Sequence, residues 1–245
     1  MHPVVKRLSI FAPLSAQEVS AISLAMANVF SVPAGHVLAR EDDPPINLLY
    51  LLEGMAYRHK TLFEGGRQIL SLLLPGDPCD VGITLLARRD HSLTAAVPSR
   101  LARISDAALE QLCSNYPRIR AAIQWATLSE ESISREWLVN VGQRSALSAM
   151  AHLMCELYYR LRAIDLVDGL NFAMPLTQSD LGDAVGITPV HSNRVVQELR
   201  RRKLIAMGDG RLTILSLQGM EELAVFDPGY LHLEARYSPA KRANS

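Results

Sequence analysis

The sequence predicts an α+β protein with an N-terminal β jelly roll, a long helix and a C-terminal winged helix-turn-helix. Three observations predict this fold class. Short apolar runs alternate with Gly and Pro from residue 32 to 104, as in sandwiches and jelly rolls. After its initial proline, the segment 117–141 contains no further Pro or Gly. Two short amphipathic segments joined by Gly186 are followed by a hairpin motif at Asp209-Gly210.

Composition restricts the class of protein. The 245 residues allow one large domain or two modest ones, and an apolar share of 49% is too high for a disordered chain. Cys79, Cys113 and Cys155 are widely spaced, which disfavours a disulfide framework, a zinc site or an iron–sulfur cluster, so we expect buried thiols. No apolar run has the length of a membrane span and the first twenty residues lack a signal-peptide core, so we expect a soluble cytoplasmic protein.

The formal net charge is zero at pH 7, which argues against a protein that coats nucleic acid by bulk attraction. The positive charge is local instead. Between Gly186 and Arg211, six basic residues stand against two acidic ones, an excess of +4 on one small element. Such an excess indicates an element that docks on DNA. The basic residues are Arg194, Arg200, Arg201, Arg202, Lys203 and Arg211, and the acidic residues are Glu198 and Asp209.

The first predicted elements are a helix and the strands of the roll. Ser15 and Glu18 form a capping box, which predicts a helix that ends near Ala27. Turns containing Gly or Pro separate the strands, and Gly65-Gly66 marks one hairpin tip. The runs expected to form strands are residues 36–39, 48–52, 69–74, 93–97 and 101–104.

A short helix and the long helix follow the roll. Ser105 is expected to cap the short helix, and Pro117 starts the long one, which runs to about Val141. One apolar stripe, interrupted by Glu130, forms either a core-facing seam or a dimer seam. Because the helix is much longer than usual, we expect it to pair with a copy of itself. The stripe consists of Ile119, Ile123, Ala126, Ile133, Trp137 and Val141.

The C-terminal part contains the helix pair that carries the functional prediction. A helix over residues 145–166 is expected to support it. Thr177 caps the first helix of the pair, Gly186 ends it, and Thr188 with Pro189 starts the second helix. An ordinary helical hairpin with a solvated basic end is the alternative, but the hairpin at 204–214 favours a winged helix-turn-helix. The packed part is expected to end at residues 226–229, before a disordered tail.

A jelly roll, a long helix and a winged helix-turn-helix in this order resemble the CRP/FNR family of bacterial transcription regulators over nearly the full length. Residues 176–205 carry the specific likeness, and the motifs at 32–35, 51–54 and 74–77 add to it. The resemblance implies a homodimer that binds double-stranded DNA on a palindromic site, acts with RNA polymerase in the bacterial cytoplasm, and is not an enzyme. The implied domains are 1–116, a cyclic-nucleotide-binding-like effector domain; 117–142, a dimerisation helix and hinge; 143–230, the DNA-binding domain; and 231–245, a tail.

The resemblance also implies roles for residues of the helix pair. Base-contacting positions of the family fall on Pro189, Val190 and Arg194, and an arginine at the last position can make a bidentate contact to guanine. Val190 replaces a commonly acidic residue and can pack on a thymine methyl group. The positions that touch phosphates in the family fall on Gln178, Ser179, Thr188 and His191. Asn193, Gln197 and Arg201 complete the expected DNA-binding set.

The roll departs from the family's cyclic-AMP-binding motifs. Cyclic-AMP-binding members carry a Gly-Glu-Leu run and an Arg-Ser/Thr-Ala run that hold the ribose and the phosphate. Here residues 79–82 and 91–95 stand at those places, the glutamate is missing, and His91 replaces the arginine. We therefore expect a cyclic nucleotide to be an unfavourable ligand, and no bound cofactor or metal. The expected effector pocket comprises Asp80, Arg88, Arg89, His91 and Ser92.

Two other function classes fit the sequence less well. A cyclic-nucleotide or small-ligand sensor that regulates a partner protein would share the roll, but the basic second helix of the pair argues for DNA. A cupin-like enzyme would need a histidine and carboxylate cluster for a metal. His36, His59 and His91 lack the close His-x-His spacing of such clusters.

Overall fold

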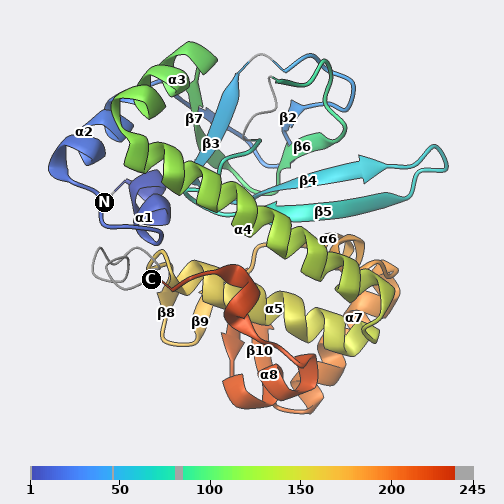
Figure 1. Ribbon diagram of the computed structural model, residues 1–245. Coiled ribbons are helices and arrows are strands. Elements are labelled where there is room, and N and C mark those ends of the chain that lie inside the picture. Colours follow the sequence, from blue (N-terminus) through green and yellow to red (C-terminus); the bar gives the residue numbers. More distant parts are fainter. Residues whose placement is uncertain (1, 46, 81–84, 235–245) are drawn as a thin grey trace.

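The computed structural model describes residues 2–45, 47–80 and 85–234. A β-rich N-terminal half and a helix-rich C-terminal half lie on either side of one long helix, α4 (Pro117–Gly142) (Figure 1). The α+β architecture predicted from the sequence is confirmed. Residues 81–82, the second half of the motif at 79–82, and residues 235–245 of the expected tail lie outside the described part.

The roll consists of two facing antiparallel sheets, with strand orders β1-β7-β3 and β2-β6-β4-β5. Leu51, Leu73, Leu93 and Leu101 lie in the core between them. The predicted apolar runs all form strands, but β1 and β4 were not predicted, because exposed or polar residues interrupt both strands. The strands are β1 (Val29–Val32), β2 (Val37–Ala39), β3 (Leu48–Glu53), β4 (Ala56–Thr61), β5 (Arg67–Leu73), β6 (Ser92–Ala95) and β7 (Ser99–Ile104).

Four helices cover the β3–β7 side of the roll: α1 (Pro3–Ser9), α2 (Ala16–Ala25), α3 (Asp106–Asn115) and the first half of α4. The predicted capping box starts α2, because the Ser15 hydroxyl accepts from the Glu18 amide and the Glu18 carboxylate accepts from the Ser15 amide. Ser105 caps α3 as predicted. Pro117 starts α4, where its missing N–H removes no helical hydrogen bond.

The apolar stripe predicted on α4 faces the protein's own core, so its interpretation as a dimer seam is wrong. Ile119, Ile123 and Ala126 pack with α1, α3 and strands β3 and β7. Ile133 and Trp137 pack with the C-terminal half. Of the predicted stripe, Val141 is exposed. The spacing could not reveal this, because a core seam and a dimer seam repeat with nearly the same period.

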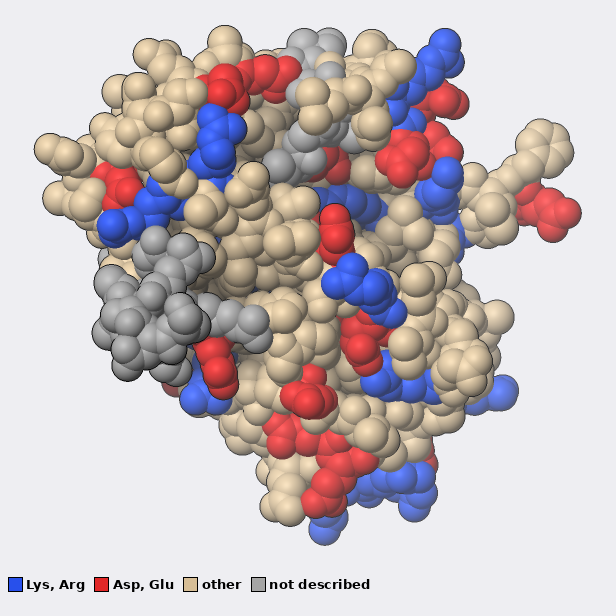
Figure 2. Space-filling model, in the orientation of Figure 1, with Lys and Arg blue, Asp and Glu red and all other residues tan. Residues whose placement is uncertain are grey.

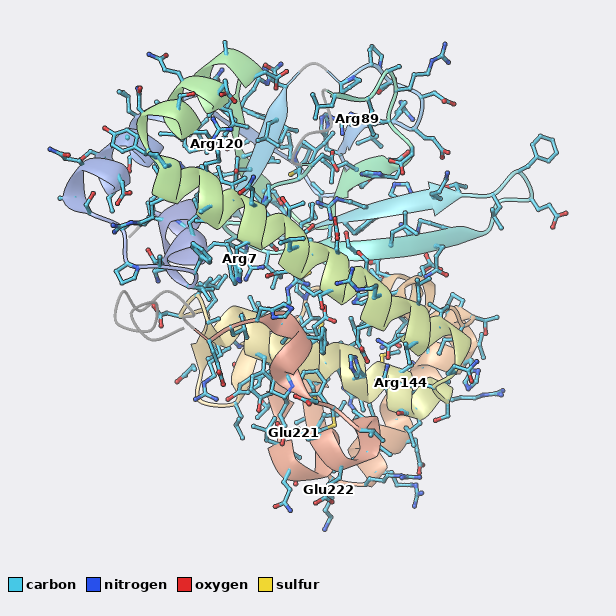
Figure 3. All side chains as sticks on the ribbon, in the orientation of Figure 1. Arg7, Arg89, Arg120, Arg144, Glu221 and Glu222 are labelled. Atoms are coloured by element: carbon cyan, nitrogen blue, oxygen red, sulfur yellow. The ribbon has the colours of Figure 1, made fainter. Side chains whose placement is uncertain are left out.

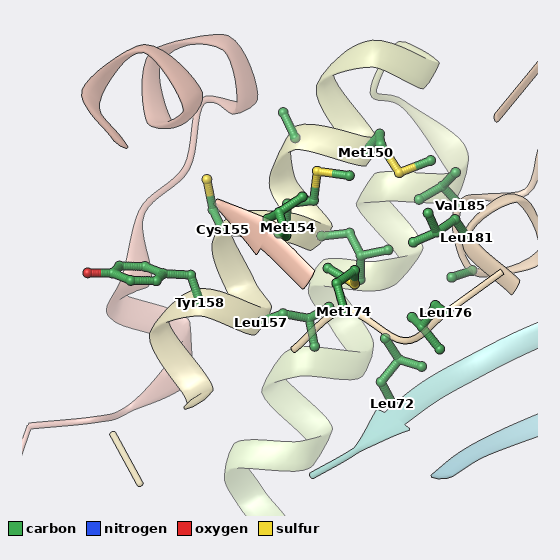
Figure 4. Packing of buried hydrophobic residues seen from close by; sticks show 14 of the residues in the cluster. Leu72, Met150, Met154, Cys155, Leu157, Tyr158, Met174, Leu176, Leu181 and Val185 are labelled. Carbon is green, nitrogen blue, oxygen red and sulfur yellow. The ribbon is translucent and has the colours of Figure 1, made fainter. Parts of the chain in front are cut away.

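The C-terminal half is a helix-turn-helix with a four-stranded wing sheet of order β10-β11-β9-β8. Met150, Met154 and Leu157 of α5 form the centre of its core (Figure 4). Packing continues past the predicted end at 226–229, because Leu231 is buried. The elements are α5 (Ala146–Arg162), β8 (Val167–Asp168), β9 (Asn171–Ala173), α6 (Gln178–Val185), α7 (Pro189–Arg201), β10 (Ile205–Gly208), β11 (Arg211–Ile214), α8 (Leu217–Ala224) and the 3₁₀ helix η2 (Pro228–Leu231).

The two halves share one hydrophobic core. Met55, Tyr57, Ile69, Leu72 and Leu74 of the roll belong to the same buried cluster as the residues of α5, α6 and α7. The roll therefore does not end at a flexible linker: its β4–β5 sheet packs directly on the helix-turn-helix.

Buried and half-buried ion pairs cross the same boundary. Asp77, in the turn after β5, accepts from Arg160 of α5 at 2.8 Å. Within the N-terminal half, Asp77 also pairs at 3.0 Å with Arg7 of α1, which is labelled in Figure 3. Arg67 of β5 pairs with Asp180 and Asp183 of α6, each at 2.7 Å. These pairs fix how the roll and the helix-turn-helix are oriented. No helix in the described ranges is both long and apolar enough to cross a bilayer.

Candidate nucleic-acid interface and effector pocket

The turn between α6 and α7 is built by its glycines and caps. Thr177 and Asp180 form a capping box at the start of α6. Gly186 ends α6 with φ +74°, a left-handed conformation that strains other residues. A Cβ atom on Gly182 would lie 2.6 Å from the Ile187 carbonyl oxygen, so only glycine lets the two helices approach this closely.

Helix α7 separates a buried face from an exposed one. The Thr188 hydroxyl accepts from the His191 amide at 3.3 Å and caps the helix, and Pro189 follows at its first position. Ser192, Val195, Val196 and Leu199 are buried on the inner face. All predicted side chains of this helix lie on the outer face, and Val190 is 64% exposed. The outer residues are Pro189, Val190, His191, Asn193, Arg194, Gln197 and Arg201.

The basic end of α7 is partly neutralised within the chain. Glu198 accepts from Arg201 at 2.7 and 2.8 Å and from Arg202 at 2.8 Å. These hydrogen bonds lower the pKa of Glu198 to about 2. Arg200 donates to the Met207 carbonyl of the wing. The positive charge available to a phosphate backbone is therefore smaller than the residue count suggested.

The residues predicted to touch phosphates lie at the two helix N-termini, where free backbone N–H groups favour anions. Ser179 and Thr188 are exposed. Gln178 is half-buried, and its side-chain oxygen accepts from Ser192 at 3.1 Å, which ties α6 to α7. The wing lies beside them and turns at Asp209 and Gly210, both with positive φ, as the hairpin motif predicted.

The predicted effector residues are brought together only in part. Asp80 accepts from Arg58 at 3.2 Å and from Arg89, and lies 2.9 Å from His91 Nε2. Arg89 lies within the roll (Figure 3). Arg88 is exposed and lies outside the pocket lining, and the Ser92 hydroxyl accepts from the Glu41 amide at 3.0 Å.

The cavity beside Asp80 lies between the roll and α4 and measures about 640 Å³. Arg58 projects from β4 to its floor and donates to Glu130 of α4 at 2.7 Å and to Ser71 at 2.9 Å. Thr127, Glu131, Ser134 and Arg135 of α4 also line it, as do Pro78, Leu85 and Leu86. Sequence reasoning missed Arg58 and the α4 residues, because they are far from Asp80 in the chain and nothing local distinguishes Arg58 from Lys60.

The contacts around Asp80 favour the charged forms of both Asp80 and His91. Burial alone would raise the pKa of Asp80, but the hydrogen bond from His91 and the charge of Arg58 hold it below its ordinary value. Burial alone would lower the pKa of His91, but its contacts with Asp80 and Asp90 raise it instead. The described residues contain no group of three His, Cys, Asp or Glu side chains able to hold a metal ion.

Acidic and basic side chains are interspersed over the face drawn in Figure 2, which spans the roll and the helix-turn-helix. This agrees with a formal net charge of zero. Attraction to a polyanion would therefore depend on local groups such as those of α7, not on the field of the whole molecule.

Two family models match this chain, one to each half. Residues 29–116 match the cyclic nucleotide-binding domain, and residues 148–223 match the Crp-like helix-turn-helix domain. The matched segments coincide with the roll and the helix-turn-helix described above.

Curated relatives extend the likeness across the boundary between the halves. The nitrogen fixation regulation protein FixK of Bradyrhizobium diazoefficiens is 27% identical over 191 residues, which is 78% of this chain and 79% of FixK. The transcriptional activator protein FnrL of Cereibacter sphaeroides is 26% identical over 76% of this chain and 75% of FnrL.

Solved structures show the same fold. FixK2 from Bradyrhizobium japonicum superposes with a TM-score of 0.72 at 20% identity and covers 82% of this chain and 98% of its own. The c-di-GMP responsive regulator CLP of Xanthomonas campestris gives a TM-score of 0.63 at 17% identity, with 82% and 100% coverage. With both halves matched in this order, the chain belongs to the CRP/FNR family of transcription regulators and carries its helix-turn-helix DNA-binding domain.

Proposed function

We propose that this regulator binds double-stranded DNA as a homodimer on a palindromic operator, with α7 of each subunit in a major groove. The outer face of α7 carries this proposal. Its polar and basic side chains are exposed on a helix whose opposite face is buried. Thr188 caps the start of the helix, and Arg200 near its end donates to the Met207 carbonyl of β10. A rigid helix with free polar side chains is the geometry that base contacts require.

Two kinds of DNA contact follow from the placement of the side chains. Arg194 and Val190 are positioned for base edges, where they would discriminate between sequences. Gln178, Ser179, Thr188 and His191 lie at the helix N-termini and would contact phosphates. Arg201, the last residue of α7, would add affinity through DNA phosphates and not through bases, and its hydrogen bonds to Glu198 make that contribution small.

The exposed face of α4 supports the dimer. Leu128 and Leu138 are 60% and 73% exposed, and Val141 is exposed beside them. Leu128, Glu131, Arg135, Leu138 and Gly142 follow one another at spacings of three and four residues, the repeat of a two-stranded helical seam. We propose that this face, and not the predicted stripe, pairs with a second copy.

We also propose that cyclic nucleotides are not the effector. A bound nucleotide would contribute a phosphate that needs an excess of positive charge in the lining. Among the described lining residues, the basic side chains of Arg58, His91 and Arg135 are matched by the carboxylates of Asp80, Glu130 and Glu131, with which they pair. Glu130 and Glu131 would face the phosphate. The residues present therefore do not fit the group that the family model names.

Family membership supports three further parts of the proposal. The two curated relatives are named as a nitrogen fixation regulation protein and a transcriptional activator protein. We infer that the bound dimer acts on RNA polymerase, that it catalyses no reaction, and that it works in the bacterial cytoplasm.

The roles of Arg194 and Arg201 can be separated by anisotropy titrations on a selected operator and on a scrambled duplex. Arg194→Ala is expected to lose about 1–3 kcal/mol of binding free energy on the operator and little on the scrambled duplex. Arg201→Ala is expected to weaken binding to both duplexes alike. Arg103→Ala, which removes an arginine that stacks on Phe30 in the roll, is the control and should bind as the wild type does. Equal losses on both duplexes for Arg194→Ala would refute its assignment to bases.

A further inference from the structure

A second cavity lies where the roll, α1 and the C-terminal half meet, and its described lining residues all differ from those of the cavity beside Asp80. It measures about 690 Å³. Sites for small molecules have volumes of roughly 300–1,000 Å³ and occur preferentially at domain interfaces. Both the size and the place of this cavity are therefore those of a ligand site.

The walls are apolar and come from both halves. Leu52, Met55 and Leu74 of the roll lie on one side. Leu161, Ile164 and Leu166, from the end of α5 and the segment after it, lie on the other. Leu166 is half exposed, so the cavity holds apolar surface that the protein itself does not cover. Transfer of a ligand's apolar body from water into this space is favourable.

The charges at the cavity select the sign of the ligand. Lys6 of α1 and Arg211 of β11 both line it. The ammonium group of Lys6 is 3.3 Å from the Ile164 carbonyl oxygen and 3.3 Å from the carboxylate of the exposed Asp165, so it is held at the cavity wall. Glu53 is the acidic residue among the described lining, and its carboxylate is paired with Arg100 at 2.5 Å. The lining therefore carries an excess of positive charge.

We propose that this cavity binds an amphipathic carboxylate such as a medium-chain fatty acid. The apolar chain lies between the leucines of the two halves, and the carboxylate accepts hydrogen bonds from Lys6, with Arg211 nearby. An ammonium–carboxylate hydrogen bond is about twice as strong as one between neutral groups, which favours an acid over an alcohol of equal length. Because the ligand contacts both halves, it stabilises the orientation in which they are docked.

Isothermal titration calorimetry on the full-length protein without DNA tests this site. Sodium decanoate is titrated below its critical micelle concentration, and decyltrimethylammonium bromide supplies the same chain with the opposite charge. Decanoate is expected to bind saturably, with one molecule per chain, and to raise the melting temperature. The cationic amphiphile is expected to bind at least about 10-fold more weakly, because it places like charges together.

Variants assign the binding to this cavity. Lys6→Met is expected to weaken decanoate binding about 10-fold, and Lys6→Arg to restore it to within about threefold. Ala173 of β9 lines the cavity, and Ala173→Trp is expected to fill the cavity and abolish decanoate binding. Leu166→Glu is a second blocking variant at an exposed position, for use if the tryptophan prevents folding. Lys60→Met, which removes a lysine paired with Glu41 far along the roll, is the matched control and should bind as the wild type does.

Three results would overturn the proposal. They are the absence of saturable binding, equal affinity for the two amphiphiles, and decanoate binding that Lys6→Met, Ala173→Trp and Leu166→Glu all leave unchanged. None of these measurements depends on DNA, so their outcome is separate from that of the proposed operator binding.

Discussion

At the scale of single residues, Asp80 organises the interior of the roll. One buried carboxylate partners Arg58 of β4 together with Arg89 and His91, which lie two residues apart just before β6. The sequence pointed to Asp80, Arg89 and His91 because they are close in the chain and occupy the family's ligand motifs. It could not point to Arg58, since that pairing depends on the register of β4 against β6.

The protonation of His91 should make stability depend on pH. Its pKa is raised above the ordinary value of 6.5, so the folded protein binds the proton more tightly than the unfolded chain does. The stabilisation is therefore complete below about pH 6.5 and is lost as the pH rises through the raised folded-state pKa. His91→Gln lacks this contribution. The difference in melting temperature between wild type and His91→Gln is expected to shrink from pH 6 to pH 9; a constant difference would contradict the ion pair.

At the scale of elements, α4 shows what periodicity can and cannot predict. Its start at Pro117 and its length were predicted, because a proline and the absence of further breakers define them locally. The expectation that the apolar stripe pairs with a second copy was wrong, because that stripe packs in the chain's own core. Two faces of α4 carry apolar residues at helical spacing. The more apolar face is buried in the protein core, whereas Leu128 and Leu138 on the other face are exposed to solvent.

Leu138 provides the test of the exposed face. Leu138→Glu places a charge in the proposed seam, where like charges of the two copies would face each other without a partner. We expect light scattering to report a monomer for this variant and a dimer for the wild type. Leu24→Glu changes a leucine of α2 that is 78% exposed and should remain dimeric. A dimeric Leu138→Glu protein would place the interface elsewhere.

At the scale of the whole molecule, the helix-turn-helix is docked on the roll and not merely linked to it. The order of the two halves could be predicted, because each carries its own local motifs. The docking of the two halves could not be predicted, because Arg67 pairs with Asp180 and Asp183 across more than a hundred residues. Nothing in the sequence around either aspartate distinguishes it from a solvent-exposed one. Only the packed structure shows that α6 rests on β5.

Arg67 should hold α6 against the roll. Arg67→Met leaves Asp180 and Asp183 without their partner, and because the pairs are a quarter exposed or less we expect a cost of about 1 kcal/mol. Amide hydrogen exchange in α6 should accelerate about fivefold, while exchange in α3 remains unchanged. Arg103→Met is the control. Unchanged exchange in α6 would show that the shared apolar core alone fixes the docking.

The central claim is that a rigid α7 is presented twice, by a symmetric pair, to successive major grooves. Selection of bound duplexes from a random pool by the wild-type protein tests this most directly. The expected product is a palindrome whose half-site centres lie about 10 base pairs apart, with a guanine in each half-site that Arg194→Ala no longer selects. Enrichment of a single asymmetric motif, or of no sequence at all, would contradict the account.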